Sequence, residues 1–432
     1  MTDLFKLSDK IIREGVANEP VNRVNFELSE IANGIAMVEA FSHSIVFATD
    51  DGLVTFDTSA EFGGQPVVKA IRGWNKDRFH SLVYTHGHVD HVGGSGAFVQ
   101  SERDAKRPDP AVIGHENISA RFDRYNMTNG YNLVVNKRQF GRAGMSNVAG
   151  MNPAGLTGGP TFLPKTAARP DITFKEEMSL SVGGLEIKLK HAKGETDDHA
   201  WAWIPEHKAI CAGDFFIWNF PNAGNPQKVQ RFPVEWAAAM RDMASMNAEM
   251  LLPAHGLPIR GSEQIKAVLE DSATALEGLV RDTLEMMNAG ATKNDIVHAV
   301  SVSQELLDKP YLRPLYDEPE FVVNNIWRLY GGWYDGNPAN LKPARESELA
   351  SEIAQLSGGS IVLAERAEEL AAAGDFRLAC HLIELAVQSD FNSKQIHGIR
   401  AKIYKQRRKI ESSLMAKGIF GYAARESSSK SE

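Results

Sequence analysis

The chain has 432 residues, of which 43% are hydrophobic and 24% charged. This length predicts two or three domains, and this composition excludes a disordered, collagen-like or disulfide-stapled chain. The formal net charge of −8 argues against nucleic acid or an anionic membrane as a partner, and no run of about 18 apolar residues could span a bilayer.

The first part of the chain predicts a mixed α/β domain over residues 1–261. Residues 1–20 alternate charged and apolar positions as an amphipathic helix does, without the pattern of a secretory signal, so we expect a cytoplasmic protein. Short apolar runs between residues 31 and 59 predict antiparallel strands, and residues 81–84 predict a further strand. Strands resume at 180–190, 200–204, 209–211 and 249–252, with a helix over 236–247.

A Gly- and Pro-rich stretch interrupts this pattern. A helix is predicted over residues 116–136, and residues 143–170 follow with no periodicity. A loop of this length is often functional, so we interpret it as a lid or substrate wall, with a plain surface excursion as the alternative.

From residue 262 the spacing of apolar residues predicts helices only. They are expected at 263–288, 293–300, 318–330, 346–355, 361–373, 376–388 and 393–409. We therefore predict an all-α domain over 262–420. The Ser- and charge-rich residues 421–432 are expected to form a disordered tail.

The segment after the strand at 81–84 carries the clearest chemical signal. Three imidazoles and one carboxylate fall within six positions, at His86, His88, Asp90 and His91. A turn leaving a strand can direct His86 and His88 to one metal ion while Asp90 and His91 reach a second. Packing four titratable groups together without a metal would cost desolvation and repulsion. The two cysteines in the chain are too few for a thiolate site, so histidine and carboxylate ligands are expected.

This segment resembles the His-x-His-x-Asp-His motif of the metallo-β-lactamase superfamily. The resemblance implies an αββα sandwich with a dinuclear site, usually zinc, and hence two Zn²⁺ per chain. It further implies that Asp214, after a strand and a glycine, is the bridging carboxylate and that His255, in Pro-Ala-His-Gly, is the last histidine ligand. Asp57 matches an aspartate that orients a ligating histidine; a turn residue at a strand end is the alternative.

The third ligand of the first metal ion has two candidates within residues 194–199. Many superfamily members have a histidine ligand where this chain has Glu195, and alkylsulfatase-like members have a glutamate there. We therefore expect Glu195 to bind the metal. His199 is expected to support the site or to replace Glu195 as the ligand.

The helical half resembles the dimerisation domain of alkylsulfatases. Residues 330–338 read Tyr-Gly-Gly-Trp-Tyr-Asp-Gly-Asn-Pro, and that family has Gly-Trp-Phe-Asp-Gly-Asn-Pro in the same place. The resemblances together cover residues 31–418 and imply a homodimer. They also imply a zinc-dependent hydrolase that cleaves a small-molecule alkyl sulfate to alcohol and sulfate through a metal-bound hydroxide, with Asp90 and Asp214 as catalytic residues.

The substrate-binding residues depart from the alkylsulfatase pattern. Asn222 falls near the asparagine that binds sulfate in that family, but Gln227 stands at the arginine position. The nearby cations are Lys228 and Arg231. A guanidinium fork suits a tetrahedral oxyanion, so Arg231 is the favoured anion clamp, and a surface salt bridge is the alternative for it.

Other functions stay open at this point. The missing arginine is compatible with a lactonase or β-lactamase on the same scaffold. A helical interaction protein with a vestigial site is a further alternative, against which the complete ligand set argues. The aromatic residues Phe215, Phe216, Trp218 and Phe220 line an alkyl pocket or belong to the core.

Overall fold

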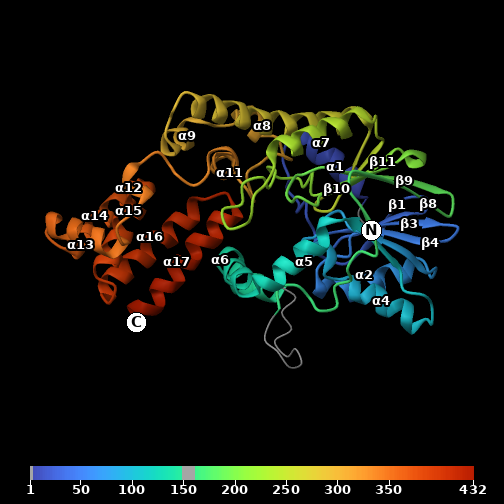
Figure 1. Ribbon diagram of the computed structural model, residues 1–432, viewed down its shortest axis with the longest axis horizontal. Helices are drawn as coiled ribbons and strands as arrows, with labels where there is room; N and C mark the ends of the chain where they lie inside the picture. The colour runs from blue at the N-terminus through green and yellow to red at the C-terminus, as the bar shows by residue number, and fades with distance from the viewer. Residues whose placement is uncertain (1–2, 148–160) are drawn as a thin grey trace. The chain divides into compact units, whose positions relative to one another are not determined.

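The computed structural model describes residues 3–147 and 161–432 (Figure 1). Internal contacts divide the chain into two compact units, Met1–Val134 with Met145–Gly332, and Val135–Gly144 with Trp333–Glu432. No helix within the described ranges combines the length and the apolar content needed to cross a membrane.

The first unit contains a seven-stranded sheet whose spatial order follows the sequence. Its strands are β1 Leu28–Ala32, β2 Ile35–Val38, β3 Ser44–Thr49, β4 Gly52–Phe56, β5 Phe79–Val83, β6 Ala111–His115 and β7 Ile172–Phe174. Strands β1 to β4 are antiparallel, and β4 to β7 are parallel. The pairing changes from antiparallel to parallel after β4. From there on helices rather than tight turns connect the strands, because a parallel connection needs a longer segment.

A second sheet of six strands has the order β13-β12-β11-β10-β9-β8. Its strands are β8 Glu177–Val182, β9 Leu185–His191, β10 Ala200–Ile204, β11 Ala209–Gly213, β12 Met250–Pro253 and β13 Ile259–Arg260, with a short 3-10 helix at Pro205–His207. Only β11 and β12 are parallel, and helix α7, Pro233–Ser245, connects them.

The two sheets share one core and are covered by helices on their outer faces. Alternate residues of the first sheet, such as Met37 and Phe47, belong to the same buried cluster as Ile187 and Trp201 of the second. The opposite face of the first sheet packs against α2 Glu61–Trp74 and α4 Ser95–Asp104 (Figure 1). The second sheet is covered by α7 and α8 Ser262–Asn288, which confirms the predicted αββα sandwich.

Helix α8 explains why the compact units do not divide where the sequence pattern changes. Its apolar side, including Ile265, Leu269 and Leu276, is buried in the core shared by the two sheets. Helices α9 Lys293–Ala299, α10 Gln304–Leu307 and α11 Pro319–Gly331 also belong to this unit. The predicted boundary between residues 261 and 262 therefore lies inside the first compact unit, and as a boundary between sequence domains it stays a prediction.

The remaining helices of the first part of the chain differ in their bounds from the prediction. Helix α1 covers Leu4–Glu14, and Gly15 ends it in a left-handed conformation. The helix expected over 116–136 is two helices, α5 Asn117–Met127 and α6 Asn129–Asn147. Helix α6 thus occupies the start of the loop expected over 143–170, and residues 148–160 of that loop lie outside the described residues.

The second unit is helical, as predicted. It contains α12 Pro338–Leu341, α13 Glu346–Ser357, α14 Ser360–Ala372, α15 Phe376–Ser389, α16 Lys394–Ile410 and α17 Leu414–Ser431. Positive φ angles at Gly358 and Gly374 allow the sharp turns between successive helices. Their apolar faces enclose a core with Leu363, Ile383 and Ile403 among its members.

Residues 421–431 are helical in the structure, whereas the sequence predicted a disordered tail. They continue α17, which packs along α16. Ser427 is buried there and accepts a hydrogen bond of 2.8 Å from Arg400, whose guanidinium also lies 3.3 Å from the Glu426 carboxylate. Polar contacts between two helices hold this segment, and they leave no apolar pattern for sequence analysis to detect.

Candidate metal centre

The carboxyl ends of parallel strands carry most of the predicted metal ligands. His86 and His88 follow β5, Asp214 follows β11, and His255 follows β12. Parallel neighbours end at the same edge of their sheet, so these ligands converge where the two sheets meet. Glu195 reaches the same place from the loop between β9 and β10.

A close packing of backbone places the other two ligands. Asp90 and His91 lie on the short helix α3, Val89–Val92, which is followed by two glycines. A Cβ atom at Gly94 would lie 2.0 Å from the Thr58 carbonyl oxygen. The backbone N–H and the hydroxyl of Thr58 each donate a hydrogen bond of 2.8 Å to the His91 carbonyl. Only glycine permits α3 to lie this close to the end of β4.

The ligand atoms form three groups in which all atoms lie within 4.8 Å of one another. The groups are His86, His88 and Glu195; His86, His91 and Asp214; and Asp90, His91 and His255. The described residues thus bring together all seven side chains that the sequence predicted as ligands. Because the groups overlap at His86 and His91, they form one continuous cluster of donor atoms rather than separate sites.

Several buried polar atoms at this place have no hydrogen-bond partner among the residues that the structure describes. They include His91 Nε2, Glu195 Oε2 and Asp214 Oδ1. A buried polar atom without a partner is costly unless something else binds it. A set of imidazole nitrogens and carboxylate oxygens is the donor chemistry that Zn²⁺ accepts, so these residues fit a divalent metal.

The charges at the centre also favour a cation. Burial, and after it the neighbouring Asp214 carboxylate, raises the pKa of Glu195 well above its usual value, although Arg231 opposes this shift. Burial and the adjacent His91 hold the pKa of His86 well below its usual value. Carboxylates and imidazoles are crowded together at this place, an arrangement that a divalent cation stabilises.

Asp57 contacts His91, one of the predicted ligands. Its Oδ2 lies 2.7 Å from His91 Nδ1, and it accepts hydrogen bonds of 2.8 Å from the N–H and the hydroxyl of Thr85. With Nδ1 bound to this carboxylate, Nε2 of His91 faces Asp214 at 3.4 Å. This is the arrangement in which a carboxylate fixes the tautomer of a metal-binding imidazole.

Glu195 and His199 occupy different positions at the centre. Glu195 Oε1 lies 3.5 Å from His88 Nδ1 and belongs to a ligand group. His199 stacks on Phe215 with ring centroids 4.0 Å apart, and its Nε2 accepts a hydrogen bond of 3.2 Å from the Asp214 N–H. Burial lowers the pKa of His199 to about 3, so this ring is a neutral support for Asp214. The geometry favours Glu195 as the ligand.

The predicted substrate residues lie beside the Glu195 carboxylate. Asn222 Nδ2 donates to Glu195 Oε1 at 2.5 Å, and Arg231 Nη1 lies 3.0 Å from that oxygen. Arg231 is 2% exposed, so the alternative of a surface salt bridge does not describe it. Lys228 lies over the Phe162 ring at 5.5 Å from its centroid, and removal from water together with the nearby Arg231 lowers the pKa of Lys228 to about 8.

Family models match most of the chain in two consecutive parts. Residues 38–255 match the model of the metallo-β-lactamase superfamily, which is half of the chain. The chain belongs to this superfamily. Residues 292–430 match the model for alkyl sulfatase dimerisation, so this superfamily member also carries the helical region expected from residues 330–338.

Curated relatives of this superfamily member include several sulfatases. A linear primary-alkylsulfatase from Pseudomonas sp. is 26% identical over 82% of this chain and 68% of its own length. An alkyl/aryl-sulfatase from Saccharomyces cerevisiae is 24% identical over 76% of this chain and 51% of its length, and an (R)-specific secondary-alkylsulfatase from Pseudomonas sp. is 24% identical over 83% and 55%. The chain thus spans between 51% and 68% of the lengths of these relatives.

A solved structure shows the same fold. The stereoselective inverting sec-alkylsulfatase Pisa1 from Pseudomonas sp. superposes with a TM-score of 0.79 at 21% sequence identity, over 93% of this chain and 65% of that one. The sandwich and the helical region that follows it are therefore shared between the two proteins.

Sequence analysis missed two residues that support or face the superfamily motif. Arg121 on α5 is buried, forms a 2.5 Å ion pair with Asp198 and contacts Asp197. A Cβ atom at Gly87 would lie 2.8 Å from Arg121 Cδ, so this arginine also packs over the His-x-His turn. The adjacent acidic residues Asp197 and Asp198, which follow Glu195, were the sequence signal for a basic partner such as Arg121. Tyr316, whose pKa is raised first by burial and then by the Glu195 and Asp90 carboxylates, has no sequence motif around it.

The aromatic run after β11 belongs to the core. Phe215, Phe216, Trp218 and Phe220 are buried in the cluster shared by the two sheets. Trp218 Nε1 donates a hydrogen bond of 2.7 Å to the Leu257 carbonyl, which ties this run to the loop carrying His255. Phe41, which meets the His255 ring edge-on at 5.7 Å between centroids, is the aromatic side chain beside a predicted ligand.

Proposed function

We propose that the chain is a dinuclear zinc-dependent hydrolase that cleaves alkyl sulfate esters to an alcohol and sulfate. The observation that carries this proposal is the group of His86, His88 and Glu195, since a glutamate at this position is the feature expected of alkylsulfatase-like members. The sulfatase relatives, which match more than three quarters of the chain, support the same substrate class.

The geometry supports a bridging role for Asp214. One oxygen, Oδ1, lies 3.4 Å from His91 Nε2 and 3.5 Å from His255 Nε2, while Oδ2 lies 3.9 Å from His86 Nε2. The two oxygens therefore face different groups of imidazoles. We assign His86, His88 and Glu195 to one zinc ion and Asp90, His91 and His255 to the other, with Asp214 between them.

Two zinc ions held there would lower the pKa of a shared water toward neutrality and polarise the sulfate ester. The protein residues keep this centre in place. Asp57 fixes the His91 ring. Asn222 and Arg231 together hold one oxygen of Glu195, so that its second oxygen, which has no hydrogen-bond partner among the described residues, is left for metal. Burial of these side chains excludes bulk water from the donor set.

We assign recognition of the sulfate group to Asn222, Lys228 and Arg231. Arg231 Nε is buried and has no hydrogen-bond partner within the described part of the chain, which leaves one guanidinium N–H group for an anion while Nη1 contacts Glu195. Lys228 supplies a second positive charge. Lys228 and Arg231, two cations of different geometry, would take the role of the arginine that the alkylsulfatase pattern has where this chain has Gln227.

The test is hydrolysis by purified protein whose zinc content has been measured on the same sample. Alkyl sulfates of several chain lengths should release sulfate, and the same protein with Glu195→Ala should lose both zinc and activity. Failure of fully zinc-loaded protein to release sulfate from any chain length would contradict the proposal.

Gln227 at the arginine position supports a second candidate, a lactonase or β-lactamase on the same zinc centre. A panel with lactone and β-lactam substrates separates the two. Turnover of either class faster than every alkyl sulfate would favour this second candidate.

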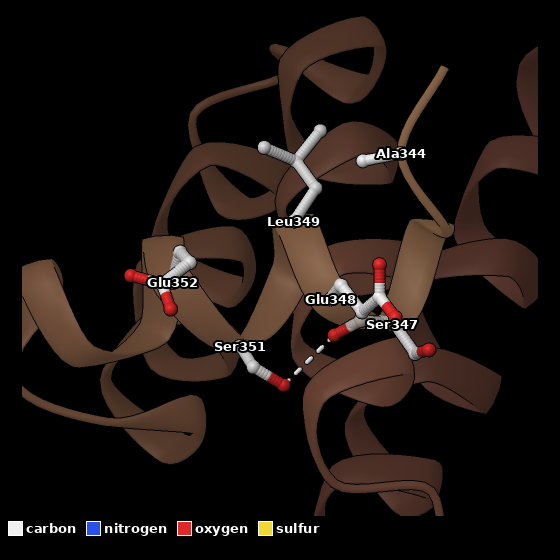
Figure 2. Close-up of a pocket in the computed structure, with 6 residues that line it drawn as sticks. All are labelled: Ala344, Ser347, Glu348, Leu349, Ser351 and Glu352. Atoms are coloured by element: carbon white, nitrogen blue, oxygen red, sulfur yellow. Dashed lines mark hydrogen bonds between the residues drawn. The ribbon is translucent and has the colours of Figure 1, made fainter. Parts of the chain in front are cut away.

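We also propose that the chain acts as a homodimer through its second unit. The match of residues 292–430 to the dimerisation model supports this. Large apolar side chains are exposed on the same unit, including Leu349, Leu356, which is 88% exposed, and Phe391. A surface hollow of about 460 Å³ lies along α13. Figure 2 shows the residues that line it, Leu349 with Ala344, Ser347, Glu348, Ser351 and Glu352. None of the predicted site residues lines this hollow.

A further inference from the structure

The segment that carries the proposed sulfate-binding residues has no regular secondary structure of its own. Residues 215–232 run between β11 and α7 as turns and irregular chain. Asn222, Lys228 and Arg231 all belong to it. A segment of this kind needs hydrogen bonds from elsewhere to hold its buried backbone in one position.

One buried amide hydrogen-bonds both the N–H and the carbonyl of Arg231, and Gln230 Nε2 donates a further hydrogen bond of 2.8 Å to that carbonyl. Asn325, on helix α11, is 3% exposed. Its Oδ1 accepts a hydrogen bond of 3.2 Å from the Arg231 N–H, and its Nδ2 donates one of 3.0 Å to the Arg231 carbonyl. Gln230 Nε2 also donates to Asn325 Oδ1, at 2.9 Å. The two-point contact fixes both the position and the direction of the chain at Arg231.

Other residues of α11 and of the turn before it hold the segment at further points. Arg328 donates to Gln230 Oε1 at 3.0 Å and to the Lys228 carbonyl at 3.3 Å. Asp317 accepts a hydrogen bond of 2.6 Å from the Gly224 N–H. A Cβ atom at Gly224 would lie 2.3 Å from the Phe321 carbonyl carbon, so the segment rests directly on the first turn of α11.

Arg231 then connects this support to the metal centre. Its Nη1 lies 3.0 Å from Glu195 Oε1 and also donates to the Glu195 carbonyl. A charge-assisted contact of this kind restricts both partners, provided that the arginine backbone cannot shift. The position of the Glu195 carboxylate thus depends on the hydrogen bonds that Asn325 makes.

We propose that Asn325 is a positioning residue for the metal centre, acting through Arg231 on Glu195. This inference rests on the proposed zinc centre but not on the identity of the substrate. It has a consequence for the helical region. Helix α11 lies among the residues that match the dimerisation model, yet it belongs to the first compact unit and supports the site there.

The test is a double-mutant cycle in zinc affinity, measured by chelator competition on the full chain. Supporting residues around a ligand typically contribute about 10- to 100-fold to metal affinity. Asn325→Ala should weaken zinc binding by about tenfold, and Arg231→Ala by at least as much. If Asn325 acts only through Arg231, adding Asn325→Ala to Arg231→Ala should change the affinity by less than about twofold.

Asn324 is the matched control. It is the preceding residue on the same helix, and its amide donates to the Glu320 carbonyl of its own helix at 2.8 Å. Asn324→Ala should leave zinc affinity within about twofold of the wild type, because its lost contact lies within α11. Asn325→Leu, which removes both polar atoms and has a similar side-chain volume, is measured alongside Asn325→Ala and decides by the same criteria if the alanine variant does not fold.

Unchanged zinc affinity in a folded Asn325 variant, or effects of Asn325→Ala and Arg231→Ala that multiply, would overturn the proposal. Sulfate release is assayed separately on the same preparations. Wild-type protein that binds two zinc ions but releases no sulfate contradicts the proposed substrate and leaves the affinity cycle valid, whereas wild-type protein that binds no zinc contradicts the centre itself.

Discussion

Single side chains determine which atoms face the metal centre. Asp57, His199 and Asn222 each contact a predicted ligand without belonging to a ligand group among the described residues. The motif at residues 86–91 and the positions of Asp214 and His255 were predictable, because a local pattern and its order along the chain identify them. Asn325 was not predictable, since it contacts a residue distant in sequence, and for Arg121 the sequence offered only the acidic pair that it contacts.

Replacing Asp57 by Asn should weaken zinc binding by about 10- to 100-fold, because an amide does not fix the His91 imidazole as a carboxylate does. Zinc affinity by chelator competition measures this. Asp50→Asn is the matched control, since Asp50 is an exposed aspartate at the turn after β3. Equal affinities for Asp57→Asn and the wild type would show that Asp57 is only a turn residue.

The pH dependence of stability should report the burial of Asp317. Burial raises its pKa to about 7, against the hydrogen bonds from backbone N–H groups at Gly224 and Glu318 that lower it. Between the ordinary carboxyl pKa of 3.8 and the raised pKa of about 7, the unfolded state has lost this proton while the folded state keeps it, so stability falls as pH rises.

Asp317→Asn removes this titration. The free energy of unfolding of the wild type, relative to Asp317→Asn, should therefore decrease from pH 4 to pH 7, as measured by urea unfolding across this range. Parallel pH profiles for the two proteins would contradict the raised pKa.

At the scale of elements, close backbone contacts decide where the ligands lie. The strands and helices were largely predictable from periods of two and of about 3.6 residues. The helical state of residues 421–431 was not, because polar contacts such as the hydrogen bond from Arg400 to Ser427 help to hold this segment. The position of α3 against the end of β4 depends on Gly94. Only the structure shows how closely the two backbones approach there.

Gly94→Ala should lower the free energy of unfolding by about 1–3 kcal/mol, the usual cost of overpacking, and should lower zinc affinity because α3 carries Asp90 and His91. Gly73→Ala on α2 is the control, since a Cβ atom there has open space. It should stabilise the protein by up to about 1 kcal/mol through helix propensity. Denaturant unfolding and zinc titration of both variants measure the difference, and equal stability for the two would refute the close-contact account.

At the scale of the whole molecule, the change from mixed α/β to helical sequence does not coincide with the division into compact units. Helices α8 and α11 follow the predicted boundary at residue 261, yet they pack in the first compact unit. Their amphipathic pattern predicts helices correctly but does not say which core they cover.

Light scattering should give the mass of two chains, and replacing exposed Leu356 by Glu tests whether α13 contributes to that assembly.

The most direct test of the central claim is a titration of metal-free protein with zinc, in which sulfate release from an alkyl sulfate and bound zinc per chain are measured together. The account predicts that activity rises with zinc and reaches its plateau at two zinc ions per chain. Two bound zinc ions without sulfate release, or full activity in protein stripped of metal, would contradict it.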